Sequence, residues 1–264
     1  MIPPDAETPR HRDTSQPATD TQARDAFAHF SHLLATRKSC RAYLPRQVPA
    51  DIIRRIVIAA QRTASWCNTQ PWRVLITRGE ATEHFRQVYS HAAVSEEPHP
   101  DFDFPTAYDG VYRKRRSDCA WQLYSSLGLE RGDRAATHAQ ALRNYDFFGA
   151  PHVAIVTTDQ HLGVYGAVDC GAYVANFLNA ATSLGIASIA QASLATYPGV
   201  IRRHFHLPDT QRVVCGISFG YPDVHHPANG FLTSRANIDD VLTWSGDEIP
   251  SSPFLPAGAP PKER

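Results

Sequence analysis

The sequence lacks the patterns that identify most hydrolases and nucleotide-binding enzymes. It contains no H-E-x-x-H, no Walker loop and no G-x-G-x-x-G after a strand-like run. A zinc-protease helix and a Rossmann dinucleotide site are therefore not predicted. The histidine pairs His204/His206 and His225/His226 match no standard ligand spacing, so we expect no metal site.

Excess charge and long apolar runs are also absent. Lys+Arg and Asp+Glu both number 26 in 264 residues, so the net charge favours neither nucleic acid nor a membrane surface, and we expect neither as a partner. No stretch approaches the roughly 20 apolar residues of a transmembrane helix, and the first residues hold no apolar signal segment. The five cysteines are far apart and form no C-x-x-C pair, which suits a reducing cytoplasm and argues against a disulfide scaffold.

Polar or proline-rich ends flank a region of alternating helical and strand-like patterns. Residues 1–24 predict a flexible N-terminal arm, residues 25–246 one domain, and residues 247–264 a Pro-rich tail. Apolar spacing predicts helices over 24–36, from Pro49 onward, and over 80–90, 107–127, 166–185 and 197–207, and strands over 74–79, 153–158 and 213–222. Helices outnumber strands and the order is mixed, which indicates an α+β fold.

Three polar features remain as candidates for chemistry. The first is Arg37-Lys38-Ser39-Cys40-Arg41, where forked guanidinium donors, an ammonium and a hydroxyl suit a phosphate, although basic residues also simply complement a helix C-terminus. The second is SWCNTQPW (65–72), whose amides can bind a heterocycle edge, or can cap a loop with core aromatics. We expect Pro71 to hold Gln70 extended and Trp72 to lie in the core. The third is Arg235, which by itself is an ordinary surface arginine.

These segments, in this order, resemble the FMN-dependent nitroreductase family. RKSCRAYLP resembles its R-R-S-x-R-x-F opening and S-x-x-N-T-Q-P-W its S-x-x-N-x-Q-P-W segment; FFGAP, GIASIAQASL, YP, VCGISFGYP and TSR follow in register. The resemblance covers about residues 28–245, and YRKRRSDCAWQLYSSLGLERGD with RNYDFFGAP makes the nitrobenzoate-reductase type the most similar. It implies a central mixed, mainly antiparallel sheet flanked by helices, in an intertwined homodimer.

The resemblance also assigns residues to a flavin phosphate. Arg37, Lys38, Ser39 and Arg41 match the positions that hold the FMN phosphate and ribityl chain, and Arg235 matches a late arginine that reaches the same phosphate. Two separate segments would then supply cations to one anion site. That reading is favoured over the alternatives that the basic residues only complement a helix C-terminus and that Arg235 is an ordinary surface arginine.

A second group of positions matches those around the isoalloxazine ring. Ser65 and Asn68, with Gln70 in the same motif, match residues that contact the flavin from the opposite subunit. Ala192 and Ser193 match the pair beside the reactive N5 edge, where some members carry Glu-Gly, so a carboxylate at N5 is missing here. Trp66 is a candidate for the substrate side.

The implied activity is that of an FMN-dependent oxidoreductase. NADH or NADPH would give a hydride to flavin N5 and leave, and a nitroaromatic or quinone-like acceptor would then enter the same pocket, in a ping-pong sequence. No side chain is expected to act as a dedicated catalytic acid or base. Two alternatives stay open: another flavin reaction of the family, such as dehydrogenation, dehalogenation or flavin consumption, and a flavin-binding protein without turnover.

Overall fold

The structure, a computed structural model, describes residues 19–245 and divides into two compact units between Leu232 and Thr233. Helix α1 begins at Asp20 and is capped by Thr19, so it starts inside the predicted arm 1–24. The unit boundary also falls before residue 246, where the predicted domain ends. The predicted tail 247–264 lies outside the described residues.

The centre of the first unit is a four-stranded sheet in the order β1-β2-β4-β3, with every neighbouring pair antiparallel. The strands are β1 (Arg73–Ile76), β2 (His152–Asp159), β3 (Ala187–Gln191) and β4 (Gln211–Gly220). A single parallel bridge joins Ser39 to Ser188 on β3 and supplies the mixed character that the family resemblance implies. The strand β3 was not among the strands predicted from periodicity.

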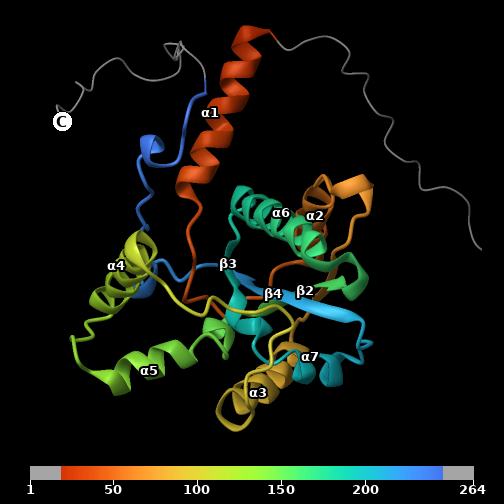
Figure 1. Cartoon of the computed structure of the whole chain (residues 1–264), viewed down its shortest axis with the longest axis vertical. Helices are drawn as coiled ribbons and strands as arrows, with labels where there is room; N and C mark the ends of the chain where they lie inside the picture. The colour runs from red at the N-terminus through yellow and green to blue at the C-terminus, as the bar shows by residue number, and fades with distance from the viewer. Residues whose placement is uncertain (1–18, 246–264) are drawn as a thin grey trace, which may run out of the picture. The chain divides into compact units, whose positions relative to one another are not determined.

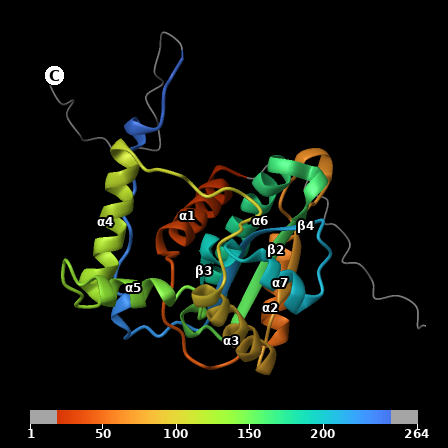
Figure 2. The same ribbon diagram turned by 60° about the horizontal axis from the view of Figure 1, so that its bottom comes forward.

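Helices cover both faces of this sheet (Figures 1 and 2). The helices of the described chain are α1 (Asp20–Thr36), α2 (Ala50–Ala60), α3 (Glu80–Ser95), α4 (Gly110–Ser126), α5 (Arg134–Leu142), α6 (Gly163–Ser183) and α7 (Pro198–Phe205). On one face α2 and α6 pack on each other and on the sheet, and on the other face α3 and α7 do so. The predicted α+β class is confirmed, and α3 extends five residues beyond the predicted helix 80–90.

The strand β2 shows why a continuous apolar run here forms a strand. Ala154 and Val156 belong to the core on the α6 side, and Val153 and Ile155 to the core on the α3/α7 side. All four side chains are fully buried, because alternate residues of a strand point to opposite faces and both faces are covered. The run VAIVTT therefore has no polar alternation.

The buried His152 at the start of β2 makes stability depend on pH. Its Nε2 accepts from the Val48 N–H at 2.9 Å, so Nδ1 carries the proton and donates to the Thr77 carbonyl at 3.0 Å. Burial lowers the pKa of this imidazole below its usual 6.5. At low pH the His152 imidazole therefore binds a proton more readily in the unfolded chain than in the native protein. The free energy of unfolding should consequently fall as the pH drops below about 6.5.

Urea titrations of the wild type and of His152→Gln between pH 5 and 8 would measure this contribution. The difference in the free energy of unfolding between the two proteins should shrink as the pH is lowered through this window. The reason is that only the wild type must release a proton from residue 152 when it folds. His225→Gln, at an exposed position, is the matched control and should leave the curve parallel to that of the wild type. A constant difference between wild type and His152→Gln would contradict the prediction.

Within residues 19–245 no helix combines the length and apolar character needed to cross a bilayer.

Candidate functional site

The Arg37–Arg41 segment, which we call the cationic segment, lies along the outer edge of β3. The helix α1 ends at Thr36, and the chain then bridges Ser39 to Ser188 while the Cys40 N–H donates to the Ser188 carbonyl at 3.2 Å. Further on, the Tyr43 hydroxyl donates to the Ser218 carbonyl on β4 at 3.0 Å. These contacts cover the edge of the sheet and fix the segment in place.

A buried asparagine that the sequence analysis did not single out holds this segment. The Asn229 Oδ1 accepts from the Arg41 N–H at 2.7 Å, and its Nδ2 donates to the carbonyls of Ala42 and Asp223 at 2.8 and 2.9 Å. Its own carbonyl accepts from Lys38 Nζ. Asn229 is 2% exposed, and no local pattern in PANGF distinguishes it from a turn residue.

Arg41 is a half-buried cation that lacks a carboxylate partner among the described residues. Its guanidinium donates to the Ser39 carbonyl at 3.4 Å and lies 5.9 Å from the centre of the Phe231 ring. Burial lowers the pKa of this guanidinium, and the Cys119 thiol of α4 is close enough to interact with it electrostatically. A partly desolvated guanidinium without an acidic partner is a site prepared for an anion.

A cavity of about 190 Å³ opens beside this segment. Arg37 and Lys38 form one part of its wall, and Thr182, Gly185 and Ile186, from the C-terminal end of α6 and just beyond, form another. The cationic segment is therefore next to open space rather than sealed in the core.

The SWCNTQPW segment forms a tight loop at the opposite edge of the sheet, just before β1. Its backbone is left-handed at Cys67 (φ 49°), Asn68 (φ 55°) and Gln70 (φ 46°). The Ser65 Oγ accepts from the Gln70 N–H at 2.9 Å, and the Trp66 N–H donates to Asp169 Oδ2 on α6 at 3.1 Å. Left-handed non-glycine residues cost free energy and persist where the surroundings hold them, often at ligand sites.

The prediction for Gln70 is wrong, and the one for Trp72 is confirmed. Proline disfavours the right-handed helical region at the residue before it, but here two bonds hold Gln70 left-handed: its N–H to Ser65, and its Oε1, which accepts from Gln61 Nε2 at 2.9 Å. Trp72 is 7% exposed and stacks on Tyr173 at 5.1 Å between ring centres. Trp66 is exposed, edge-on to Tyr165.

Ala192 and Ser193 begin the 3-10 helix Ala192–Ala195 at the C-terminal end of β3. Ala192 is exposed, and the first backbone N–H groups of a helix have no partner within it. The Ser193 hydroxyl donates to Asn144 Oδ1 at 3.3 Å, and the same oxygen accepts from Gln191 Nε2 at 3.2 Å. The predicted pair thus has a small exposed side chain at Ala192, and Asn144 holds the hydroxyl of Ser193 by a hydrogen bond.

The two parts of the predicted site lie far apart within one chain. Ser188, beside the cationic segment, pairs with Phe219 on β4, which in turn pairs with His152 on β2, whereas Arg73, after the SWCNTQPW loop, pairs with Thr157 on β2. Ser188 and Arg73 are therefore separated by five residues along the strand direction and by three strand spacings across the sheet. Together these give a distance on the order of 20 Å. One chain therefore does not bring Ser65 and Asn68 to Arg37–Arg41.

Arg235 belongs to the second unit. There its guanidinium donates to the carbonyl and hydroxyl of Thr233 and to the Ser234 carbonyl, and it is exposed. Its contact with a phosphate stays a prediction.

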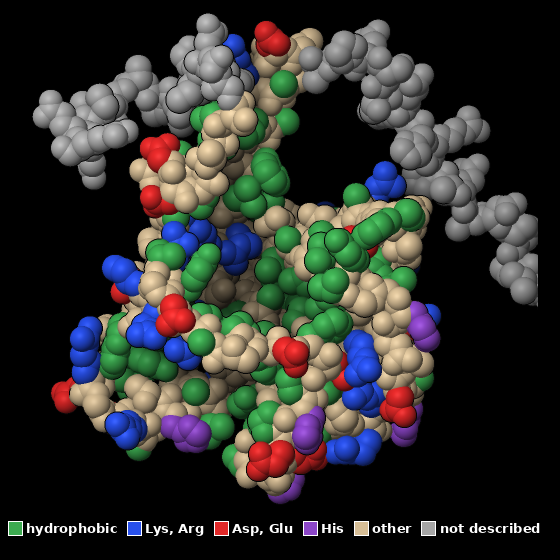
Figure 3. Space-filling model, viewed as in Figure 1, with side chains coloured by type: hydrophobic (Ala, Val, Ile, Leu, Met, Phe, Trp, Pro, Cys, Tyr) green, Lys and Arg blue, Asp and Glu red, His purple; other side chains and the backbone are tan. Residues whose placement is uncertain are grey.

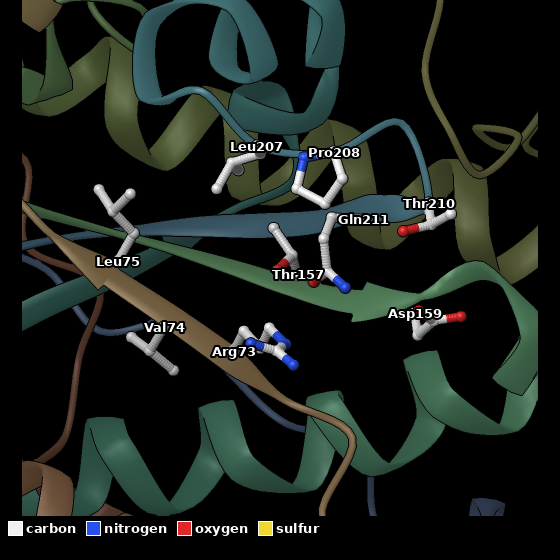
Figure 4. Close-up of a pocket in the computed structure, with 9 residues that line it drawn as sticks. All are labelled: Arg73, Val74, Leu75, Thr157, Asp159, Leu207, Pro208, Thr210 and Gln211. Carbon is white, nitrogen blue, oxygen red and sulfur yellow. Dashed lines mark hydrogen bonds between the residues drawn. The ribbon is translucent and has the colours of Figure 1, made fainter.

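A cavity of about 500 Å³ contains none of the predicted site residues (Figure 4). It lies between β1 and the turn that leads from α7 into β4, and its lining includes Arg73 and Leu75 from β1, Asp159 from β2, and Leu207 and Pro208 from the turn. It therefore belongs to the β1 edge of the sheet and not to the cationic segment.

The residues present fit a flavin phosphate on one side and a flat ring on the other. The donor set around Arg41 is cationic in a chain without net charge, and Ala192 and Ser193 are small residues, of which Ala192 is exposed. Among residues 19–245, no group of three or more His, Cys, Asp or Glu side chains is arranged to hold a metal ion.

Comparison with known proteins gives a consistent result. The model of the nitroreductase family matches residues 34–221. The chain is 31% identical over 231 residues to a 4-nitrobenzoate reductase of Nocardioides sp. (strain LMS-CY), covering 84% of this chain and 92% of that protein. It is 30% identical over 217 residues to a 4-nitrobenzoate reductase of Pseudomonas putida, covering 82% and 96%.

A solved structure shares the fold. The FMN-dependent nitroreductase NfnB from Mycobacterium smegmatis, in complex with NADPH, superposes with a TM-score of 0.79 at 30% identity. The match covers 83% of this chain and all of that one.

Proposed function

This chain belongs to the nitroreductase family, and from that membership we propose that it is an FMN-dependent NAD(P)H oxidoreductase that reduces nitroaromatic acceptors. The observation that carries the proposal is the half-buried Arg41, a cation without a carboxylate partner in the described chain, in the same short segment as Arg37 and Lys38, which line an open cavity. Its similarity to a 4-nitrobenzoate reductase supports a nitroaromatic acceptor, and its similarity to a nitroreductase solved in complex with NADPH supports a nicotinamide donor. The five free thiols suit a reducing compartment, and we expect the cytoplasm.

The protein's own residues would bind and orient the cofactor. Arg37, Lys38, Ser39 and Arg41 would hold the phosphate, because guanidinium and ammonium donors form strong charge-assisted hydrogen bonds to phosphate oxygens. The family resemblance assigns Arg235 to the same phosphate. Ala192 and Ser193 would lie at the N5 edge and leave the reactive face open.

A second copy of the chain would complete the site. The α6 face that points away from the core carries the exposed residues Val168, Gly171 and Ala175. Figure 3 shows hydrophobic side chains gathered along α1 and over α6. On these two helices Phe27, Phe30 and Tyr165 are more than half exposed. Apolar surface of this extent favours a partner, and small residues let helices approach closely.

The spacing along α6 fits a two-fold pair of helices. The SWCNTQPW loop is tied to Asp169, and the cavity of the cationic segment reaches Thr182, 13 residues or about 20 Å further along the helix. Two α6 helices that cross antiparallel near Ala175 would bring the loop of each copy to the cationic segment of the other. Ser65, Asn68 and Gln70 would then contact FMN from the opposite subunit of a homodimer.

When bound, FMN supplies the redox chemistry by taking a hydride from NADH or NADPH and delivering electrons to the acceptor. The protein's contribution is binding, orientation and the electrostatics around the ring. Cations and N–H donors would favour negative charge on the ring, so no side chain is needed as a dedicated acid or base. A flat aromatic acceptor fits beside the small side chains of Ala192 and Ser193.

Anaerobic stopped-flow reduction of the purified yellow protein tests this proposal. Bleaching of the flavin by NADPH or NADH, followed by reoxidation on mixing with 4-nitrobenzoate, is the expected result. Bleaching without reoxidation by nitroarenes would point to another acceptor and overturn the nitroreductase assignment. A protein that neither carries nor takes up FMN would overturn the whole proposal.

Arg41→Ala should weaken FMN binding by about thirtyfold, which corresponds to roughly 2 kcal/mol for charge-assisted hydrogen bonds to a phosphate. Fluorescence titration of the apoprotein with FMN would give the dissociation constant. Arg46→Ala is the matched control, because Arg46 is also a nearby arginine but stacks on Tyr221 at 4.4 Å outside the segment. Unchanged FMN affinity in Arg41→Ala would remove this residue from the phosphate site.

A further inference from the structure

A chain of polar side chains lies directly behind Ser193. Its members, which we call the Asn144 network, are Ser193, Asn144, Gln191 and Ser218. Gln191 and Ser218 are buried in the sheet, on β3 and β4, and Asn144 follows α5. The network connects the start of the Ala192–Ala195 helix to the centre of the sheet.

Backbone carbonyls fix the orientation of both amides in this network. The Asn144 Nδ2 donates to the Ala141 carbonyl at 2.9 Å, and the Gln191 Nε2 donates to the Asn144 carbonyl at 3.0 Å. A carbonyl only accepts, so each amide must turn its nitrogen to that partner and its oxygen the other way. Gln191 Oε1 then accepts from the Ser218 hydroxyl, as the geometry shows.

This orientation commits the hydrogen of the Ser193 hydroxyl. Asn144 Oδ1 can only accept, and it lies 3.2 Å from Gln191 Nε2 and 3.3 Å from Ser193 Oγ. Since Ser193 has one hydroxyl hydrogen, that hydrogen points at Asn144 and away from the exposed side of the helix. On the side of Ala192, Ser193 Oγ offers lone pairs alone.

We propose that the Asn144 network makes Ser193 Oγ an obligate hydrogen-bond acceptor toward the bound flavin and thereby favours its reduced form. The inference rests on the proposed function, which sets Ser193 at the N5 edge. Oxidised flavin carries a bare nitrogen at N5, an acceptor that gains nothing from a second acceptor, whereas reduced flavin carries an N5–H donor. Asn144 and Gln191 are positioning residues here, because they act on the flavin through Ser193.

The test is the midpoint potential of bound FMN in a double-mutant cycle. Asn144→Leu frees the Ser193 hydroxyl to donate to oxidised N5, so the ratio of reduced to oxidised FMN at a fixed potential should fall about tenfold, the effect of one hydrogen bond. For a two-electron couple that ratio corresponds to about 30 mV. Ser193→Ala should also lower the potential, and Ser193→Thr, which keeps the hydroxyl, should restore it.

The decisive comparison is Asn144→Leu made in the Ser193→Ala background. If Asn144 acts through the hydroxyl, the second substitution should leave the potential unchanged once the hydroxyl is gone. Ser90→Ala is the matched control, because it removes a hydroxyl that donates to the neighbouring Tyr145 carbonyl outside the network, at 3.1 Å. It should keep the potential of the wild type.

Two results would overturn the inference while leaving the proposed function intact. One is an Asn144→Leu protein that binds FMN with the potential of the wild type. The other is an equal shift with and without the Ser193 hydroxyl, which would mean that Asn144 acts only by shaping the loop. A wild-type protein that takes up no FMN would overturn both proposals.

Discussion

Replacing Ala175 with arginine is expected to give a monomer that no longer retains FMN. Ala175 is exposed near the middle of α6, where we propose that the same helix of a second copy crosses. An arginine at a close helix crossing must either bury its charge without a partner or push the helices apart. Because Ser65 and Asn68 would reach the flavin only from the other subunit, loss of the dimer should also release the cofactor.

Light scattering after size-exclusion chromatography would give the mass, and absorbance near the flavin band would give the FMN content. Val94→Arg is the matched control: it places the same charge on an apolar residue that is 70% exposed, on α3 at the other face of the sheet. That variant should stay dimeric and yellow. A monomeric Ala175→Arg protein that keeps its FMN would show that one chain suffices for the site.

Asp101→Ala is expected to lower the free energy of unfolding by about 3–5 kcal/mol, the usual cost of breaking a buried ion pair from one side. The Asp101 side chain is 3% exposed and accepts from Arg202 at 2.7 Å, from Arg212 at 3.1 Å and from the Val213 N–H at 2.8 Å. Its removal leaves two arginines and a backbone donor without their partner. It also releases the loop between α3 and α4 from the start of β4.

Urea unfolding of both proteins at one pH measures this loss. Asp209→Ala is the matched control, because Asp209 faces the same Arg202 at 3.9 Å but is fully exposed. Exposed pairs contribute little, so the control should lose less than about 1 kcal/mol. A loss of that small size in Asp101→Ala would mean that the buried carboxylate contributes no more than a surface one.

Local sequence patterns were sufficient for most elements of the fold. The continuous run VAIVTT predicted β2, because both faces of that strand are buried, and the spacing of Ile52, Ile53 and Ile56 predicted α2. The short β3 was missed: apart from Ile189, its five residues ASIAQ are small or polar, so neither alternation nor a bulky apolar run marks them. Its status as a strand comes from its pairing with β4, which is a long-range contact.

By itself the sequence determined which segments carry the candidate chemistry. The reason is that the residues able to bind phosphate cluster in the sequence: Arg37, Lys38 and Arg41 lie within five positions. Only the tertiary structure decided how these segments relate to the rest. The register of the sheet sets the SWCNTQPW loop and the cationic segment at opposite corners, and packing decides which face of α6 is free. The roles of Asn229, Gln191 and Asn144 follow from hydrogen bonds between residues far apart in the chain, and no local pattern encodes such contacts.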